Sequence, residues 1–321
     1  DAGVRMRWGI AATGGIARTV GRVIAAEPGM RVSAVGSRSK ERAAVLAQEL
    51  DAELAFGSYA ELCAADEVDA VFVATPHAQH LEIAAAAIAH GKAVLCEKPL
   101  TARLDEAERM VALAREAGVF LMEAMWMRFN PLIQKIAADE RFGEIRGVQA
   151  AFGFPQPYDP AHRLWDPALG GGALLDLGVY PFALAQLLLG TPVDMHVTGS
   201  LGPSGVDAEA GVLLAYGGGR RALLDTSLLS PHPNSATVIG TEMRADIPAA
   251  FWAPRRIVLT RPGAEPEEHV LDPEENGYRG EVREVARAVA EGRTESAIMP
   301  LDDSLAVMRQ LEEARRRLGA R

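Results

Sequence analysis

The chain has 321 residues, of which 49% are hydrophobic and 24% are charged, and its formal net charge is −10. This composition excludes disordered, collagen-like and coiled-coil proteins, and the length predicts two domains. The excess of acids, 43 Asp and Glu against 33 Lys and Arg, argues against a nucleic-acid or anionic-membrane surface and favours a small-molecule partner.

Cysteine content and apolar segments bear on the compartment. Cys63 and Cys96 are the only cysteines, too few for a disulfide framework or a Cys-rich metal site, so the chain fits a reducing cytoplasm. We expect no membrane span, because Gly, His or Lys interrupts the longest apolar runs. The first ten residues lack the apolar core of a signal peptide.

The first 125 residues alternate between strand-like and helix-like segments. Strand patterns cover 5–12, 30–37, 69–75, 93–96 and 119–124, and helical patterns cover 16–27, 40–50, 80–90 and 104–118. The strands are continuous apolar runs, which is typical of strands buried on both faces. The pattern predicts an α/β domain with a doubly wound parallel sheet over residues 1–125.

Residues 126–321 change in character. Strand-like segments at 147–154, 193–201, 210–229 and 235–243 are joined by glycine-rich turns, and the triple glycine at 217–219 predicts a hairpin. Helical patterns at 280–291 and 302–318 end the chain. We expect a second, α+β domain for substrate binding and oligomerisation, with the terminal helix free to pack back on the first domain.

The first strand-to-helix turn resembles a dinucleotide fingerprint. In "AATGGIA", Gly14 and Ala17 align with the later small residues of G-x-G-x-x-G/A, while Ala12 replaces the first glycine. The helix N-terminus would offer amide donors to a pyrophosphate. The turn predicts cofactor contacts, and the alternative is a tight turn without a ligand. The predicted contacts are Thr13, Gly14, Gly15 and Ile16.

The end of the second strand, "GSRSKER", bears on the kind of nucleotide. NAD sites carry an acid here for the ribose hydroxyls, whereas a 2′-phosphate prefers a hydroxyl and a guanidinium. Ser37 and Arg38 occupy this place, with Arg42 one turn on, and Arg38 can form charge-assisted bonds to a phosphate. NADP is therefore favoured over NAD. The alternative is a solvated basic turn.

Two further strand ends carry polar residues on the same predicted edge, where ligands of open α/β sheets bind. "TPHAQH" supplies Thr75, Pro76, His77 and His80, and "CEKPL" supplies Glu97 and Lys98. The H-x-x-H spacing could serve a metal, but no third ligand lies nearby, so we expect no metal site.

The segment "GGGALLDLGVYP" predicts an apolar helix after a glycine run. Asp176 and Tyr180 are four residues apart and so share a helix face, and Pro181 cannot donate to the carbonyl of Leu177, which should bend the helix there. The alternative interpretation is a core tyrosine with a structural aspartate.

Together, "ATGGIA", "GSRSKERA", "ATPHAQH", "CEKPL", "EAMWMRFNP" and "GGGALLDLGVYP" resemble the glucose-fructose oxidoreductase family, also called Gfo/Idh/MocA. They follow the family order across more than half of the chain. The tyrosine at 180, where many relatives have histidine, resembles the branch of dimeric dihydrodiol dehydrogenase and NADP-dependent sugar dehydrogenases.

The resemblance implies a Rossmann domain, a second domain with a large, open, mixed and mostly antiparallel sheet, and homodimers or homotetramers built through that sheet. It also implies that Lys98 lies in the active site and that the bond before Pro99 is often cis.

Hydride transfer at a carbonyl or hydroxyl carbon needs a proton acceptor or donor. We assign that role to Tyr180, with Lys98 as its electrostatic partner and substrate anchor and Asp176 as an orienting group. Arg128 is a further expected cofactor contact. Trp126, Arg163 and Trp165 are candidate substrate contacts, although Trp126 could equally be a core residue and the other two could belong to a solvated loop.

The sequence thus predicts an NADP-dependent oxidoreductase acting on a small polyhydroxylated substrate, a sugar or a trans-dihydrodiol. Two alternatives stay open. One is a non-catalytic NADP(H)-binding sensor or regulatory protein, and the other is a redox-assisted glycosidase of the same fold that recycles its nucleotide.

Overall fold

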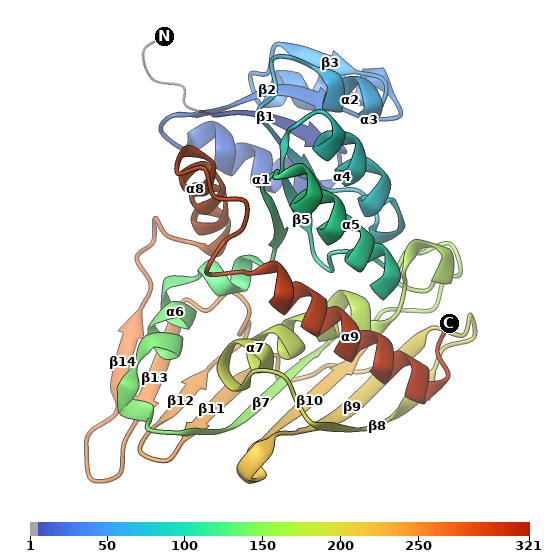
Figure 1. Cartoon of the computed structure of the whole chain (residues 1–321). Coiled ribbons are helices and arrows are strands. Elements are labelled where there is room, and N and C mark those ends of the chain that lie inside the picture. The colour runs from blue at the N-terminus through green and yellow to red at the C-terminus, as the bar shows by residue number, and fades with distance from the viewer. Residues whose placement is uncertain (1–5) are drawn as a thin grey trace. The chain divides into compact units, whose positions relative to one another are not determined.

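The computed structural model describes residues 6–321, so Arg5, the first residue of the expected opening strand, lies outside the described residues. The chain divides into two compact units. Of the described residues, the first comprises 6–125 with 278–304, and the second comprises 126–277 with 305–321. Figure 1 shows the elements of both.

The first unit holds a parallel six-stranded sheet in the order β3-β2-β1-β4-β5-β6, the strand order of dinucleotide-binding folds. Its strands are β1 (Met6–Ala11), β2 (Met30–Gly36), β3 (Leu54–Phe56), β4 (Ala70–Val73), β5 (Ala93–Glu97) and β6 (Leu121–Ala124). Its helices are α1 (Gly15–Ala26), α2 (Lys40–Glu49), α3 (Tyr59–Ala64), α4 (His80–Ala89), α5 (Leu104–Ala117) and α8 (Gly277–Ala290). The continuous apolar strands are buried along β4 and β5, as expected for a sheet covered on both faces.

The short β3 and α3 gave no recognisable pattern in the sequence. Three half-buried residues and a six-residue helix are too brief for a hydrophobic period to stand out. The other strands and helices expected in the first 125 residues are present. The helix α8 joins this unit through Arg279 and Arg283, which both pair with the buried carboxylate of Glu27 at the end of α1.

The second unit holds a mixed eight-stranded sheet in the order β14-β13-β12-β11-β7-β10-β9-β8. All neighbours pair antiparallel except β10 with β7. The strands are β7 (Ile145–Gly153), β8 (Asp194–Leu201), β9 (Asp207–Ala215), β10 (Arg221–Ser227), β11 (Ala236–Gly240), β12 (Arg244–Ile247), β13 (Arg256–Thr260) and β14 (Glu267–Val270). The helices are α6 (Pro131–Ala138), α7 (Val179–Leu189) and α9 (Leu301–Leu318). The expected open, mostly antiparallel sheet is confirmed.

The expected hairpin joins β9 and β10 at the triple glycine. Gly218 and Gly219 have φ values of 72° and 76°, which residues with a Cβ rarely adopt. Arg221 then pairs with Ala215 across the hairpin.

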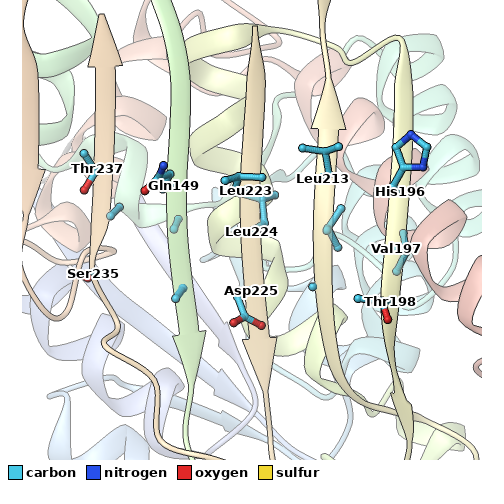
Figure 2. A pocket seen from close by; sticks show the side chains of 15 residues that line it. Gln149, His196, Val197, Thr198, Leu213, Leu223, Leu224, Asp225, Ser235 and Thr237 are labelled. Atoms are coloured by element: carbon cyan, nitrogen blue, oxygen red, sulfur yellow. The ribbon is translucent and has the colours of Figure 1, made fainter. Parts of the chain in front are cut away.

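Burial alternates along β9 and β10, because one face of this sheet is covered and the other is open. The helix α7 packs against β7 and β10 on the covered face. On the open face, cross-strand pairing aligns Thr237, Gln149, Leu223, Leu213 and His196 in one row over five strands, and Figure 2 shows these side chains lining a shallow hollow.

The stretch Pro167–Leu189, which includes α7, is long and apolar enough by composition to cross a membrane, contrary to the expectation that no segment qualifies. Of its most apolar window, 83% is buried inside the structure. Burial on all sides is what an interior helix of a folded domain requires, and it explains why α7 has no polar face.

Candidate functional site

The turn after β1 leaves the start of α1 open. Gly14 and Gly15 are exposed, and a Cβ added to either would meet no atom within 4 Å. In the described part of the chain, the first turn of α1 has neither an acidic side chain nor a side-chain cap. Thr13 and Ile16 are half-buried beside it. The unfilled amide groups at this helix end suit a phosphate.

Ala12 occupies the position of the fingerprint's first glycine and has φ of 123°. That conformation suits glycine and strains a residue with a Cβ. The backbone therefore adopts the conformation expected of the fingerprint glycine although the residue itself is changed.

Thr75 follows β4 at the same carboxyl-end edge of the parallel sheet as the start of α1, and it also has a polar group available to a ligand. It is buried, and its Oγ1 has no hydrogen-bond partner among the described residues. A buried hydroxyl normally finds a partner, so one supplied by a ligand would satisfy it. Pro76 is exposed and His77 half-buried in the 3-10 turn that follows.

The end of β2 presents the residues expected to select the nucleotide. Ser37 is buried and its Oγ accepts from the Ser39 amide at 3.2 Å, while Ser39 caps α2. The side chains of Arg38 and Arg42 are exposed. Two guanidinium groups thus stand beside the loop without a carboxylate at the strand end.

Lys98 follows β5, and its bond to Pro99 is cis. The side chain of Glu97 turns back, so that its Oε2 accepts the Lys98 amide at 3.1 Å. Glu97 is buried and Lys98 is half-buried.

His80 connects this motif to the neighbouring strand end. Its Nε2 lies 2.9 Å from the Thr75 carbonyl, and its Nδ1 lies 3.1 Å from the carbonyls of both Pro99 and Leu100. Burial lowers the pKa of His80, although the hydrogen bonds to the three carbonyls act in the opposite direction. Because the ring is fully buried and its nitrogens face three main-chain carbonyls, its position favours holding the strand ends together over touching a cofactor directly.

A second buried acid lies close to Glu97. Glu281 on α8 is completely buried, and neither of its carboxyl oxygens has a hydrogen-bond partner among the described residues. Burial, with the charge of Glu97 as the next cause, raises the pKa of Glu281 well above its ordinary value. Burial and the nearby charge of Glu97 therefore both favour the protonated form of Glu281.

In the second unit, Tyr180 lies near the start of α7 and is 6% exposed. The indole Nε1 of Trp126 donates a hydrogen bond of 2.7 Å to its hydroxyl oxygen. Phe152 on β7 and Trp252 stack with ring centroids 3.7 Å apart, and their centroids lie 5.7 and 6.0 Å from that of Tyr180. The Tyr180 hydroxyl group is thus surrounded by aromatic side chains.

The expected irregularity before Pro181 is present as a π-helical segment, Leu174–Gly178. The prediction that Asp176 and Tyr180 share a face assumed 3.6 residues per turn, and a π-turn is wider. Both residues are buried, Asp176 near the middle of the π-segment and Tyr180 just after it.

Asp176 binds Arg163, whose Nη1 lies 2.9 Å from Oδ1. The other loop candidate, Trp165, is 1% exposed and donates through its indole to the carbonyl of Pro157, so it packs the loop. Arg128 is also buried. Among the described residues, no group of three or more His, Cys, Asp or Glu side chains could hold a metal.

Sequence reasoning did not single out Phe152, Trp252 or Glu281. Phe152 carried a weak signal, because it lies in the predicted strand 147–154. In the structure this strand, β7, packs against α7, the helix that carries Tyr180. Trp252 lies in a loop between β12 and β13, and only the tertiary fold brings it to Tyr180.

Comparison with known proteins identifies the chain. Residues 6–125 match the model described as "Oxidoreductase family, NAD-binding Rossmann fold" (GFO_IDH_MocA), and residues 132–246 match that of the GFO/IDH/MocA C-terminal domain. The chain belongs to the GFO/IDH/MocA oxidoreductase family. The family expected from the sequence motifs is therefore confirmed.

Relatives in this family are similar over their full length. Trans-1,2-dihydrobenzene-1,2-diol dehydrogenase of Mus musculus is 36% identical over 98% of this chain and 97% of its own, and the Danio rerio protein is 35% identical with the same coverage. A 3-ketoreductase from Actinomadura kijaniata, solved with NADP and TDP-benzene, is 31% identical with a TM-score of 0.82 over 97% of each chain. Aldose-aldose oxidoreductase from Caulobacter crescentus, at 24% identity and TM-score 0.87 over 98% of this chain and 97% of that one, shares the fold.

Proposed function

We propose that this oxidoreductase is NADP-dependent and interconverts a hydroxyl and a carbonyl group on a small polyhydroxylated substrate, a sugar or a trans-dihydrodiol. The observation that carries the proposal is the buried Tyr180 hydroxyl, which accepts the Trp126 indole N–H within an aromatic surround. The similarity to dihydrodiol dehydrogenases and to a 3-ketoreductase supports the same class of reaction.

The residues of the first unit fit an NADP cofactor. The open start of α1 would hold the pyrophosphate, Ser37, Arg38 and Arg42 would hold the 2′-phosphate, and Thr75 has a buried hydroxyl to offer. The nicotinamide, when bound, supplies the hydride acceptor or donor. NAD would leave the guanidinium groups of Arg38 and Arg42 without a phosphate.

Tyr180 moves the proton. In oxidation, the substrate C–H leaves as hydride and its O–H proton passes to the ionised Tyr180 oxygen, so that a carbonyl forms; in reduction, the neutral Tyr180 gives this proton back. The Trp126 N–H stabilises the negative charge of the ionised oxygen. The proposal requires Lys98 to act on the same substrate as an electrostatic partner and anchor.

Asp176 is proposed as the orienting group of the site, and its present partner is Arg163. The Arg163 side chain is partly exposed, so a substrate hydroxyl could replace it on the carboxylate. Phe152 and Trp252 offer the ring of a dihydrodiol or the apolar face of a sugar a flat surface.

The open sheet face is the proposed homo-oligomer interface. Leu223 is 43% exposed in the middle of the cross-strand row, beside Leu213 (Figure 2). Apolar residues grouped on one open sheet face favour association of identical chains. The buried, unpaired Cys63 and Cys96 are consistent with the proposed cytoplasmic location.

The test is spectrophotometric formation of NADPH, with NADH in parallel, from a panel of aldoses, inositols, deoxysugars and trans-dihydrodiols. Tyr180→Phe is the matched control, since it removes one oxygen and keeps the ring. Turnover with NADP that this substitution abolishes is the expected result. Saturable NADPH binding without turnover would instead identify a sensor, and release of sugar without net NADPH would identify a redox-assisted glycosidase.

A further inference from the structure

Asp207, at the start of β9, is a completely buried acid with no role in the function proposed above. The β8–β9 ladder is interrupted beside it: Ser200 pairs with Glu209, but Leu201 pairs with Asp207, so one residue of β9 is extra. Such a bulge redirects a side chain. Asp207 and Ala208 are accordingly both buried although they are adjacent in a strand.

The carboxylate of Asp207 reaches the helix that carries Asp176 and Tyr180. Its Oδ2 accepts the main-chain N–H of Leu174 at 2.6 Å. Leu174 is the first residue of the π-segment, and the residue before it offers no side-chain cap. The first N–H groups of a helix need an external acceptor, and an anion there is favourable. Asp207, which lies on strand β9, supplies that acceptor to the helix.

The glycine run before the helix makes this approach possible. Gly172 has φ of 111°, and a Cβ at Gly172 would lie 2.4 Å from the Asp207 Oδ1. Any larger residue would have to displace the carboxylate. Position 172 therefore requires glycine, because its main chain packs directly against the Asp207 carboxylate.

The charged group that faces Asp207 from α9 is Arg315, whose Nε lies 4.0 Å from Oδ1. Arg315 also donates through Nη2 to the carbonyl of Arg321 at 2.5 Å. The other nearby acids on the same elements are Glu209 on β9, which accepts from Ser200, and Asp176, which pairs with Arg163. Burial raises the pKa of Asp207 to about 6, although the Leu174 amide and Arg315 act in the opposite direction.

We propose that Asp207 is the positioning residue of the proposed active-site helix: its carboxylate fixes the first turn at Leu174 and thereby the placement of Asp176 and Tyr180. The effect on turnover rests on the proposed function, whereas the effect on the helix does not. Loss of the carboxylate charge, by substitution or by acid, would loosen the first turn, because an ionised acceptor makes the stronger hydrogen bond.

Hydrogen–deuterium exchange of the peptide spanning 170–180 tests the proposal directly. The protein is studied at pH values on either side of about 6, where Asp207 titrates, with exchange normalised to the intrinsic rate. Asp207→Asn keeps the size and one acceptor oxygen but removes the charge. Glu209→Gln, two residues along β9, is the matched control, and the peptide of α6 is the internal reference.

The expected result is strong protection of 170–180 at neutral pH, weaker protection in acid, and weak protection at both pH values in Asp207→Asn. Glu209→Gln should behave as the unsubstituted protein. Equal protection of 170–180 in Asp207→Asn and in the unsubstituted protein at both pH values would overturn the proposal. If Asp207→Asn does not fold, the unsubstituted protein alone tests the proposal. Protection of 170–180, relative to the α6 peptide, that does not change with pH would overturn the proposal.

Steady-state kinetics give the second readout. We expect kcat of Asp207→Asn to fall about 10- to 100-fold, the cost of a small misplacement of catalytic groups, with the NADPH dissociation constant unchanged. In the unsubstituted protein kcat should decrease as pH falls through about 6, and in Asp207→Asn this decrease should be absent. An unchanged decrease would count against the proposal. Absence of turnover on every substrate would overturn the proposed function, and the exchange experiment would still decide the role of Asp207.

Discussion

The hydrogen bond between Trp126 and Tyr180 allows a sharp test of the proposed acid/base residue. Trp126→Phe keeps an aromatic ring and removes the indole N–H that lies 2.7 Å from the Tyr180 oxygen. A hydrogen bond to an oxygen that gains negative charge contributes about 1.5–3 kcal/mol. Lost from the transition state, this corresponds to a decrease of about 10- to 150-fold in kcat/KM.

The assay is a double-mutant cycle on kcat/KM for the best substrate of the panel. Tyr180→Phe alone should lower activity by about 10²- to 10⁴-fold, as expected when an acid/base group is removed. In the Tyr180→Phe background, Trp126→Phe should cost less than about twofold, because the oxygen that it stabilises is absent. NADPH binding and the near-ultraviolet circular dichroism serve as controls for folding.

Two results would refute this reasoning. One is a kcat/KM of Trp126→Phe within about twofold of the unsubstituted protein, which would mean that the indole N–H does not act on a charged oxygen. The other is an equal loss in both backgrounds, which would mean that Trp126 contributes by packing edge-to-face against the ring at position 180 or by binding substrate.

Four further changes test other parts of the structure. Arg38→Ala should raise the KM for NADP about 10- to 100-fold and leave that for NAD nearly unchanged, whereas equal effects would contradict the phosphate assignment. Burial and the charge of Glu97 raise the pKa of Glu281, so its contribution to stability is full at low pH and is lost as pH rises through the folded-state pKa. Glu281→Gln should therefore reduce the decline of the unfolding free energy with rising pH, measured by urea titration at a series of pH values. An unchanged dependence of the unfolding free energy on pH would argue that Glu281 is not protonated in the folded protein. Ala12→Gly should relieve about 1 kcal/mol of backbone strain and raise the melting temperature by a few degrees, and a lower melting temperature would disprove the strain. Leu223→Lys should shift the protein to monomers in sedimentation while its unfolding free energy changes little, because Leu223 lies on the open sheet face; an unchanged mass would exclude that face as the interface.

The sequence by itself predicted the parallel sheet of the first unit and the family. Apolar runs such as 69–75 and 93–96 are long enough to be recognised, and motifs such as "CEKPL" combine a strand end with side chains of definite chemistry. Apolar runs and short motifs are formed by consecutive residues, so they can be recognised in one amino-acid sequence without the fold. The hairpin at Gly217–Gly219 and the irregularity before Pro181 were predicted for the same reason.

The tertiary structure decided which distant residues meet. Trp126 and Tyr180 are 54 residues apart and Leu174 and Asp207 are 33 apart, and no local period links either pair. His80 offered a ligand-like spacing with His77, yet folding surrounds its ring with the carbonyls of Thr75, Pro99 and Leu100. Burial, hydrogen-bond partners and pKa shifts are properties of a packed environment. They exist only once strands from separate parts of the chain are brought together, which is why the acids Glu281 and Asp207 could not be recognised before the fold was known.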